Sequence, residues 1–337
     1  MKYAKWLFCL AVLGSWLLAS AAYAEVKPIE LSYSIFFPAP HKQTALATEW
    51  AKEIEKRTEG KVKITIFPGG TLTPADKCYD GVVKGISDLG MSALAYTRGK
   101  FPLTEVIDLP LGYRSAVAAT RLINRYYEKF KPEEFKEVKV MYFHAHGPGL
   151  LNTKGAVKKL EDLKGMKIRS TGLSAKVVSA LGGPPVAMPM GETYDALRRG
   201  VVDGSMAPIE ALEGWKWGEV VKYTTESYGA AYSTGFFVVM NQDKWNALPS
   251  NIQKIFEKVN TEWIEKTGRL WETIDKSGRE YTLKRGNQII SLSKEEDDRW
   301  AKAVGPILDE YLKNTKEKGL TGEAALKFCR EQLKKLQ

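Results

Sequence analysis

The sequence predicts an α/β fold of two lobes that share one long helix. Strand-like and helix-like segments alternate through the first half of the chain, which is typical of α/β domains with a largely parallel sheet. The length of 337 residues suggests two domains or one large one. A helical pattern that begins near residue 250 would be roughly 50 Å long at 1.5 Å per residue, so we expect it to run along both lobes.

The first 24 residues have the features of a signal peptide. Lys2 and Lys5 give a positive start, residues 7–18 are mostly apolar, and Ala22-Tyr23-Ala24 fits a cleavage site. The apolar run is too short to favour a membrane span. Cys9 is not preceded by the small residues that a lipid-attachment site needs. We therefore expect an exported periplasmic protein, rather than a lipoprotein, with no membrane insertion after cleavage.

Composition argues against a nucleic-acid partner and leaves open whether two cysteines form a disulfide. The chain has 50 Lys and Arg residues against 40 Asp and Glu residues. These charges are spread rather than clustered with aromatic residues, so no nucleic-acid partner is expected. Cys78 and Cys329 remain after cleavage and can pair in an oxidising compartment. The sequence leaves open either a disulfide or two separate buried thiols.

The first half of the chain alternates strands with helices. Apolar residues at 31, 33 and 35 alternate with serines, as in a strand. The helix that follows carries an apolar face and ends at Gly60, and Pro74 suits the first turn of the next helix. We expect strands at 31–35, 62–66, 89–94 and 138–142 and helices at 44–57, 73–83 and 117–130.

A second alternation begins near Leu151. We expect strands at 166–170, 185–188 and 235–240 and helices at 174–181 and 192–199. The long helix is predicted to open with a capping box at 250–253 and to end at Gly286, and Gly268 and Gly278 are positions where it could kink. A second box at 293–296 opens a helix toward Tyr311, and a last helix covers 323–336.

No residues form a convincing catalytic or metal site. His144 and His146 share one face of a predicted strand, but the acidic residues or cysteines that a zinc site also needs are not nearby in the sequence. The chain has no Gly-x-Ser-x-Gly elbow and no glycine-rich phosphate loop. We therefore expect no catalytic residue, no metal and no cofactor.

Arg169, at the end of a predicted strand, is the main candidate for binding. Its planar guanidinium matches a carboxylate in bidentate fashion. Spacing alone allows a solvated or salt-bridged cation. The functional interpretation requires a buried cation that lacks a protein acid, because such a costly group is satisfied by an anionic ligand. Together with the export signal, it suggests a secreted receptor for a small organic acid.

Several segments in a characteristic order resemble a known family. The chain resembles the solute-binding proteins of tripartite ATP-independent periplasmic (TRAP) transporters. The resemblance implies a two-lobed, periplasmic-binding-protein-like fold that closes on its ligand, and membrane permease subunits as partners. It also implies that Arg169 pairs with a substrate carboxylate and that Met190 covers the ligand. The matching segments are residues 50–60, 67–72, 162–169, 188–197, 200–204 and 240–249.

The same resemblance divides the chain. The predicted parts are a signal peptide at 1–24, lobe I at 25–147, lobe II at 148–234, a return to lobe I at 235–250, the shared helix at 251–285, and a C-terminal strand and helices at 286–337.

Two departures from the family pattern narrow the expected ligand. Many members carry a second arginine near residues 147–151, and many carry Glu-Asn where this chain has Met206-Ala207. Each polar group on a ligand needs a partner, so a monocarboxylate with an apolar or aromatic body fits better than a dicarboxylate or sugar acid. Candidate lining residues, each equally compatible with plain core, are Phe36, Phe37, Tyr96, Trp215 and Phe236.

Three polar residues are further candidates. His41 and Glu210 are possible polar contacts to the ligand. Asn241 is a hinge residue, a carboxylate neighbour or part of a structural turn. Two other functions stay open at this point: an exported two-lobed enzyme acting on small acids, and the solute receptor of an ATP-driven importer.

Overall fold

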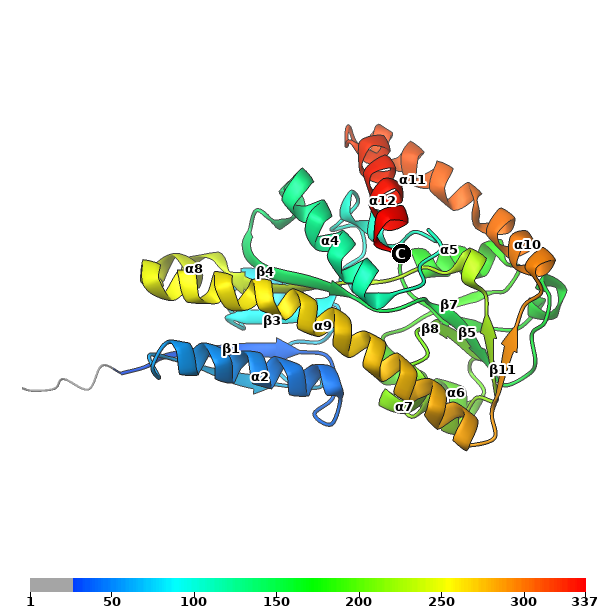
Figure 1. Cartoon of the computed structure of the whole chain (residues 1–337), viewed down its shortest axis with the longest axis horizontal. Helices are drawn as coiled ribbons and strands as arrows, with labels where there is room; N and C mark the ends of the chain where they lie inside the picture. Colours follow the sequence, from blue (N-terminus) through cyan, green and yellow to red (C-terminus); the bar gives the residue numbers. More distant parts are fainter. Residues whose placement is uncertain (1–26) are drawn as a thin grey trace, which may run out of the picture.

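A computed structural model describes residues 27–337 and shows two sheets linked by one long helix (Figure 1). The predicted signal peptide therefore lies outside the described residues. We call the lobe built on the first sheet lobe I and the lobe built on the second sheet lobe II. The two-lobed α/β prediction is confirmed, while the boundaries proposed for the lobes stay a prediction.

Lobe I is built on a five-stranded sheet of order β2-β1-β3-β10-β4. β10 is antiparallel to both β3 and β4, whereas β1 is parallel to β2 and β3. β10 comes back from lobe II, and it runs against the other four strands. The strands are β1 (Ile29–Ile35), β2 (Val62–Phe67), β3 (Leu89–Ala93), β4 (Val138–Ala145) and β10 (Gly235–Asn241).

Helices α2 (Lys42–Arg57), α3 (Cys78–Val83) and α4 (Ala116–Phe130) pack on this sheet. The expected helix at 73–83 is wrong in its first part, since α3 begins only at Cys78. The Thr73 hydroxyl lies 2.6 Å from that of Ser34 on β1, so this segment is anchored to the sheet before the helix starts.

Lobe II is built on a six-stranded sheet of order β11-β9-β5-β8-β6-β7. Its central strands are short, and β5 and β8 pair antiparallel while β6 and β8 pair parallel. The strands are β5 (Leu150–Thr153), β6 (Ile168–Ser170), β7 (Pro185–Ala187), β8 (Gly204–Ala207), β9 (Tyr223–Glu226) and β11 (Gln288–Ser291). Its helices are α5 (Leu173–Ala180), α6 (Met190–Arg199) and α7 (Ala211–Gly214).

The long helix is α9 (Ser250–Lys284), and it packs on α2, α4 and β4 of lobe I and on α7 of lobe II (Figure 1). Gly268 and Gly278 do not interrupt it. A Cβ on Gly278 would lie 2.5 Å from the Ile209 carbonyl oxygen, so this glycine permits close backbone approach. The predicted capping box is wrong, because Pro249 is the N-cap and Gln253 donates to the Trp245 carbonyl at 2.8 Å.

The C-terminal helices connect the lobes on another side of the molecule (Figure 1). They are α10 (Lys294–Val304), α11 (Pro306–Glu317) and α12 (Gly322–Leu336). The Ser293 hydroxyl caps α10 by accepting from the Glu296 amide at 3.2 Å, which is half of the predicted capping box. The Glu296 side chain does not complete the box but accepts from the Leu160 amide at 2.9 Å. The expected single helix toward Tyr311 is divided at Pro306, because a proline inside a helix removes a hydrogen bond and suits a helix start. α12 packs on α4, and α11 packs on α5.

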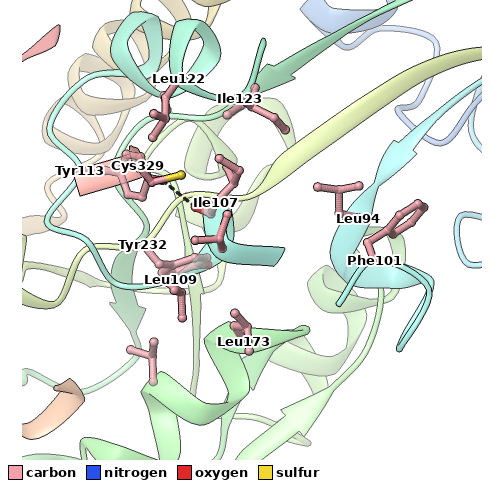
Figure 2. Packing of buried hydrophobic residues seen from close by; sticks show 14 of the residues in the cluster. Leu94, Phe101, Ile107, Leu109, Tyr113, Leu122, Ile123, Leu173, Tyr232 and Cys329 are labelled. Atoms are coloured by element: carbon pink, nitrogen blue, oxygen red, sulfur yellow. Dashed lines mark hydrogen bonds between the residues drawn. The ribbon is translucent and has the colours of Figure 1, made fainter. Parts of the chain in front are cut away.

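The possible Cys78–Cys329 disulfide is not formed, and both residues are free, buried thiols. Figure 2 shows Cys329 in the cluster with Tyr113, whose hydroxyl donates to the Ile107 carbonyl at 2.7 Å. Cys78 belongs to the same cluster and packs against β3, where a Cβ on Gly90 would lie 2.8 Å from its sulfur. Burial raises the pKa of both thiols, that of Cys78 to about 12.

Candidate functional site

A cavity lies where the two lobes meet α9. Lobe I contributes residues from the ends of its strands, and lobe II contributes residues around β6, α6 and β8. The lobe I side includes Phe36, Phe37, Ala93, Tyr96, His146 and Phe236. The lobe II side includes Arg169, Thr171, Met190, Met206, Ala207 and Glu210. Trp271 of α9 also lines the cavity.

Arg169 is the buried cation of this cavity. Arg169 is 3% exposed, and its Nε donates to the Met188 carbonyl oxygen at 2.9 Å. Its Nη2 has no hydrogen-bond partner, and no carboxylate pairs with the guanidinium within residues 27–337. The cation is thus neither solvated nor salt-bridged, which leaves an N–H edge available for an anion.

Tyr96 and Met190 link the two lobes beside this cation. Tyr96 ends a short 3₁₀ turn after β3, and its hydroxyl accepts a hydrogen bond from the Met190 amide at 3.3 Å. Burial raises the pKa of Tyr96, and the neighbouring Arg169 only partly opposes this rise. The phenol therefore stays neutral. Met190 begins α6 and is 9% exposed at the cavity wall.

Aromatic rings also line the cavity. The ring planes of Phe36 and Phe236 are inclined by 9° with centroids 6.0 Å apart, and Phe236 stacks on Trp271 at 5.5 Å. Trp215, which the sequence also proposed as a wall residue, does not line the cavity. It packs beside Phe36 at 6.3 Å and Phe37 at 6.0 Å, and it therefore supports the rings that do.

Of the three polar candidates, only Glu210 lines the cavity. His41, the N-cap of α2, accepts the Gln43 amide at its Nδ1 at 3.1 Å. This places the ring hydrogen on Nε2, which donates to Glu210 Oε2 at 3.2 Å. The contact joins lobe I to lobe II with both side chains buried. Asn241 caps helix α8 (Gln242–Ala247) by accepting the amides of Asp243 and Lys244, so it forms a structural turn.

Nine of the sixteen lining residues were not among the site residues proposed from the sequence, and three of these nine carry rings: His146, Tyr232 and Trp271. His146 Nδ1 donates to the Gly147 carbonyl at 2.5 Å. Burial, with Arg169 nearby, lowers the pKa of His146 to about 4, so its Nε2 is a neutral hydrogen-bond acceptor. The pairing of His144 with His146 on one strand face was a usable signal. Trp271 shared the apolar periodicity of α9 with core residues, and Tyr232 lies outside any regular pattern.

Comparison with known protein families identifies the family of this chain. Residues 33–314 match the family described as bacterial extracellular solute-binding protein, family 7. The chain belongs to this family. It is therefore a periplasmic solute-binding protein of the TRAP type and not a member of an enzyme family. No helix within residues 27–337 is long and apolar enough to cross a membrane.

Three solved structures are similar to this TRAP solute-binding protein. A TRAP solute-binding protein from Desulfovibrio salexigens is 34% identical, with a TM-score of 0.81 and coverage of 91% of this chain and 96% of that chain. One from Bordetella bronchiseptica, with bound mandelate, is 30% identical, with a TM-score of 0.85 and coverage of 92% and 100%. One from a marine metagenome, with 3-hydroxybenzoate, is 28% identical, with a TM-score of 0.88 and coverage of 92% and 99%.

Proposed function

We propose that this protein is the receptor for a small monocarboxylate with an aromatic or apolar body. Arg169 pairs with the carboxylate, and the rings of Phe36, Phe236 and Trp271 surround the body of the acid. The single observation that carries the proposal is the unpartnered, buried Nη2 of Arg169 in a cavity with aromatic walls. Pockets of this kind bind ligands through apolar walls and a few convergent polar groups.

The ligands of the similar proteins support this choice. Mandelate and 3-hydroxybenzoate, bound in the Bordetella and marine proteins, are both aromatic monocarboxylates. Within the described part of the chain, the residues that line the cavity include one Arg, Arg169, and no Lys. A second carboxylate on the ligand would therefore lack a cationic partner and would face Glu210. This favours monocarboxylates over dicarboxylates.

In this role, ligand binding favours the closed arrangement of the two lobes, and the closed form delivers the acid to a TRAP-type membrane permease. Closure removes water from around the Arg169–carboxylate pair, which strengthens the electrostatic attraction. TRAP permease genes beside the gene for this chain would support delivery to that permease. Genes for an ATP-driven importer in that position would contradict it.

The first test is a thermal-shift screen of the purified protein, with mass spectrometry of any acid released on unfolding. Benzoate, mandelate, 3-hydroxybenzoate, pyruvate, succinate and glucuronate make a discriminating panel. A ligand present at 100 times its Kd adds about 2.7 kcal/mol of stability, which raises the melting temperature measurably. The largest shift is expected from an aromatic monocarboxylate. A largest shift from succinate or glucuronate, or no shift from any acid, would contradict the proposal.

A further inference from the structure

The cavity contains a second buried polar atom without a partner. Glu210 is 2% exposed and lines the cavity. Its Oε1 has no hydrogen-bond donor within residues 27–337, whereas its Oε2 accepts from His41 at 3.2 Å. A buried acceptor without a donor costs free energy. A ligand that donates a hydrogen bond to Oε1 would remove this cost.

Local contacts hold the Glu210 carboxylate in place. The backbone amide of Glu210 donates to Asp275 Oδ1 on α9 at 3.1 Å. A Cβ on Gly214 would lie 2.5 Å from Glu210 Oε2 and 2.9 Å from His41 Nε2. A side chain there would collide with the His41–Glu210 hydrogen bond. These contacts occupy one oxygen, and the other is left for the ligand.

We infer that the bound acid also carries a hydroxyl group, whose hydrogen is accepted by Oε1 of Glu210 while Arg169 holds the carboxylate. This inference rests on the proposed function and specifies the class of acid: a hydroxylated aromatic monocarboxylate. Glu210 is thus a specificity-determining residue rather than an affinity anchor.

A hydroxyl suits this position better than an ammonium group. One hydroxyl hydrogen matches the one free oxygen of Glu210. An ammonium group brings three hydrogens, and each of them needs an acceptor when it is buried. The phenylalanines on the lobe I side, Phe36, Phe37 and Phe236, provide no such acceptor. An ammonium group would therefore need His146 Nε2 or a lining hydroxyl in addition to Glu210, whereas a hydroxyl needs Glu210 alone.

The test is calorimetric binding of matched acids to the ligand-stripped, full-length mature protein. The pairs are mandelate with phenylacetate, and 3- or 4-hydroxybenzoate with benzoate. The corresponding methoxybenzoates fill similar space but donate no hydrogen. In at least one pair, the hydroxy acid is expected to bind about tenfold or more tightly than its partner and than the methoxy analogue, as expected for a hydrogen bond to a charged group. This comparison requires no variant to fold.

The substitution Glu210→Gln sharpens the test. His41 Nε2–H would still donate to the oxygen of the new amide, which turns the amide NH₂ toward the cavity. The variant then offers a donor where the wild type offers an acceptor. The oxygens of a hydroxyl and of a methoxy group can both accept from this amide, so we expect the hydroxy acid to lose its advantage over the methoxy analogue. Glu213→Gln on the same short helix α7 is the matched control, because Glu213 does not line the cavity, and it should leave both preferences unchanged.

The outcomes separate this inference from the proposed function. Equal binding of hydroxy and unsubstituted acids to the wild type would overturn the role of Glu210 and leave the receptor intact. So would an unchanged preference of the Glu210→Gln variant for the hydroxy acid over its methoxy analogue. Tighter binding of phenylalanine than of every hydroxy acid would overturn the hydroxyl assignment. Failure of all the aromatic acids to bind would contradict the proposed function, and the inference would fail with it.

Discussion

Replacing Arg169 with alanine is the most direct test of the proposed receptor. Its Nε is already engaged by the Met188 carbonyl, so the two Nη groups remain for the carboxylate. Each hydrogen bond to a charged group contributes about 1.5–3 kcal/mol. Two such bonds amount to about 3–6 kcal/mol, which corresponds to affinity weakened by about two to four orders of magnitude.

A lysine at this position separates charge from geometry. Arg169→Lys keeps a cation, but it replaces two parallel N–H groups of fixed direction with one flexible ammonium. We expect this variant to bind the acid more weakly than the wild type and more tightly than Arg169→Ala. Equal binding by the lysine variant and the wild type would contradict the bidentate geometry while leaving the charge pairing in place.

The assay is calorimetric titration of ligand-stripped protein with the acid that gives the largest shift in the thermal screen. Arg198→Ala is the matched control. Arg198 also lies in lobe II, on α6, but its side chain is 60% exposed and pairs only with Asp195, so its loss should not change the affinity. If folded Arg169→Ala protein bound the same acid within threefold of the wild type, the assignment of Arg169 would be refuted.

Three further predictions concern stability. Burial lowers the pKa of His144 to about 3. Below pH 6.5 the ring is protonated in the unfolded protein but not in the folded protein, so the free energy of unfolding decreases as the pH falls. From pH 8 to pH 5 this decrease is about 2 kcal/mol. In urea unfolding, His144→Gln should lack this loss, and an unchanged pH dependence would contradict the buried, neutral ring. Gly278→Ala should lower the melting temperature, because the new Cβ would lie 2.5 Å from the Ile209 carbonyl oxygen and overpacking costs about 1–3 kcal/mol. Gly191→Ala is the control and should not lower it, because no atom lies within 4 Å of its Cβ. Equal melting temperatures of the two variants would show that α9 moves aside freely. Thiol titration of the denatured, unreduced mature protein should find both Cys78 and Cys329 free, and a melting temperature that falls on addition of reductant would indicate a disulfide instead.

Errors in the predicted helices have local physical causes that periodicity does not report. The apolar pattern after residue 293 continues across Pro306, but the proline forces a new helix to start. Ser250 and Gln253 have the spacing of a capping box. In the fold, however, Gln253 donates to the Trp245 carbonyl, and Pro249 takes the cap position. Competing tertiary partners thus decided which local motif formed.

The sequence by itself determined the alternation of strands and helices, the length of α9 and the place of Arg169 at a strand end, because these depend on residue spacing along one element. Only the tertiary structure decided that His146 of lobe I, Tyr232 of a connecting segment and Trp271 of α9 meet at one cavity. Periodicity shows which face of an element is buried, but it does not show what that face packs against. The contacts between lobes therefore determine which buried residues belong to the core and which are available to a ligand.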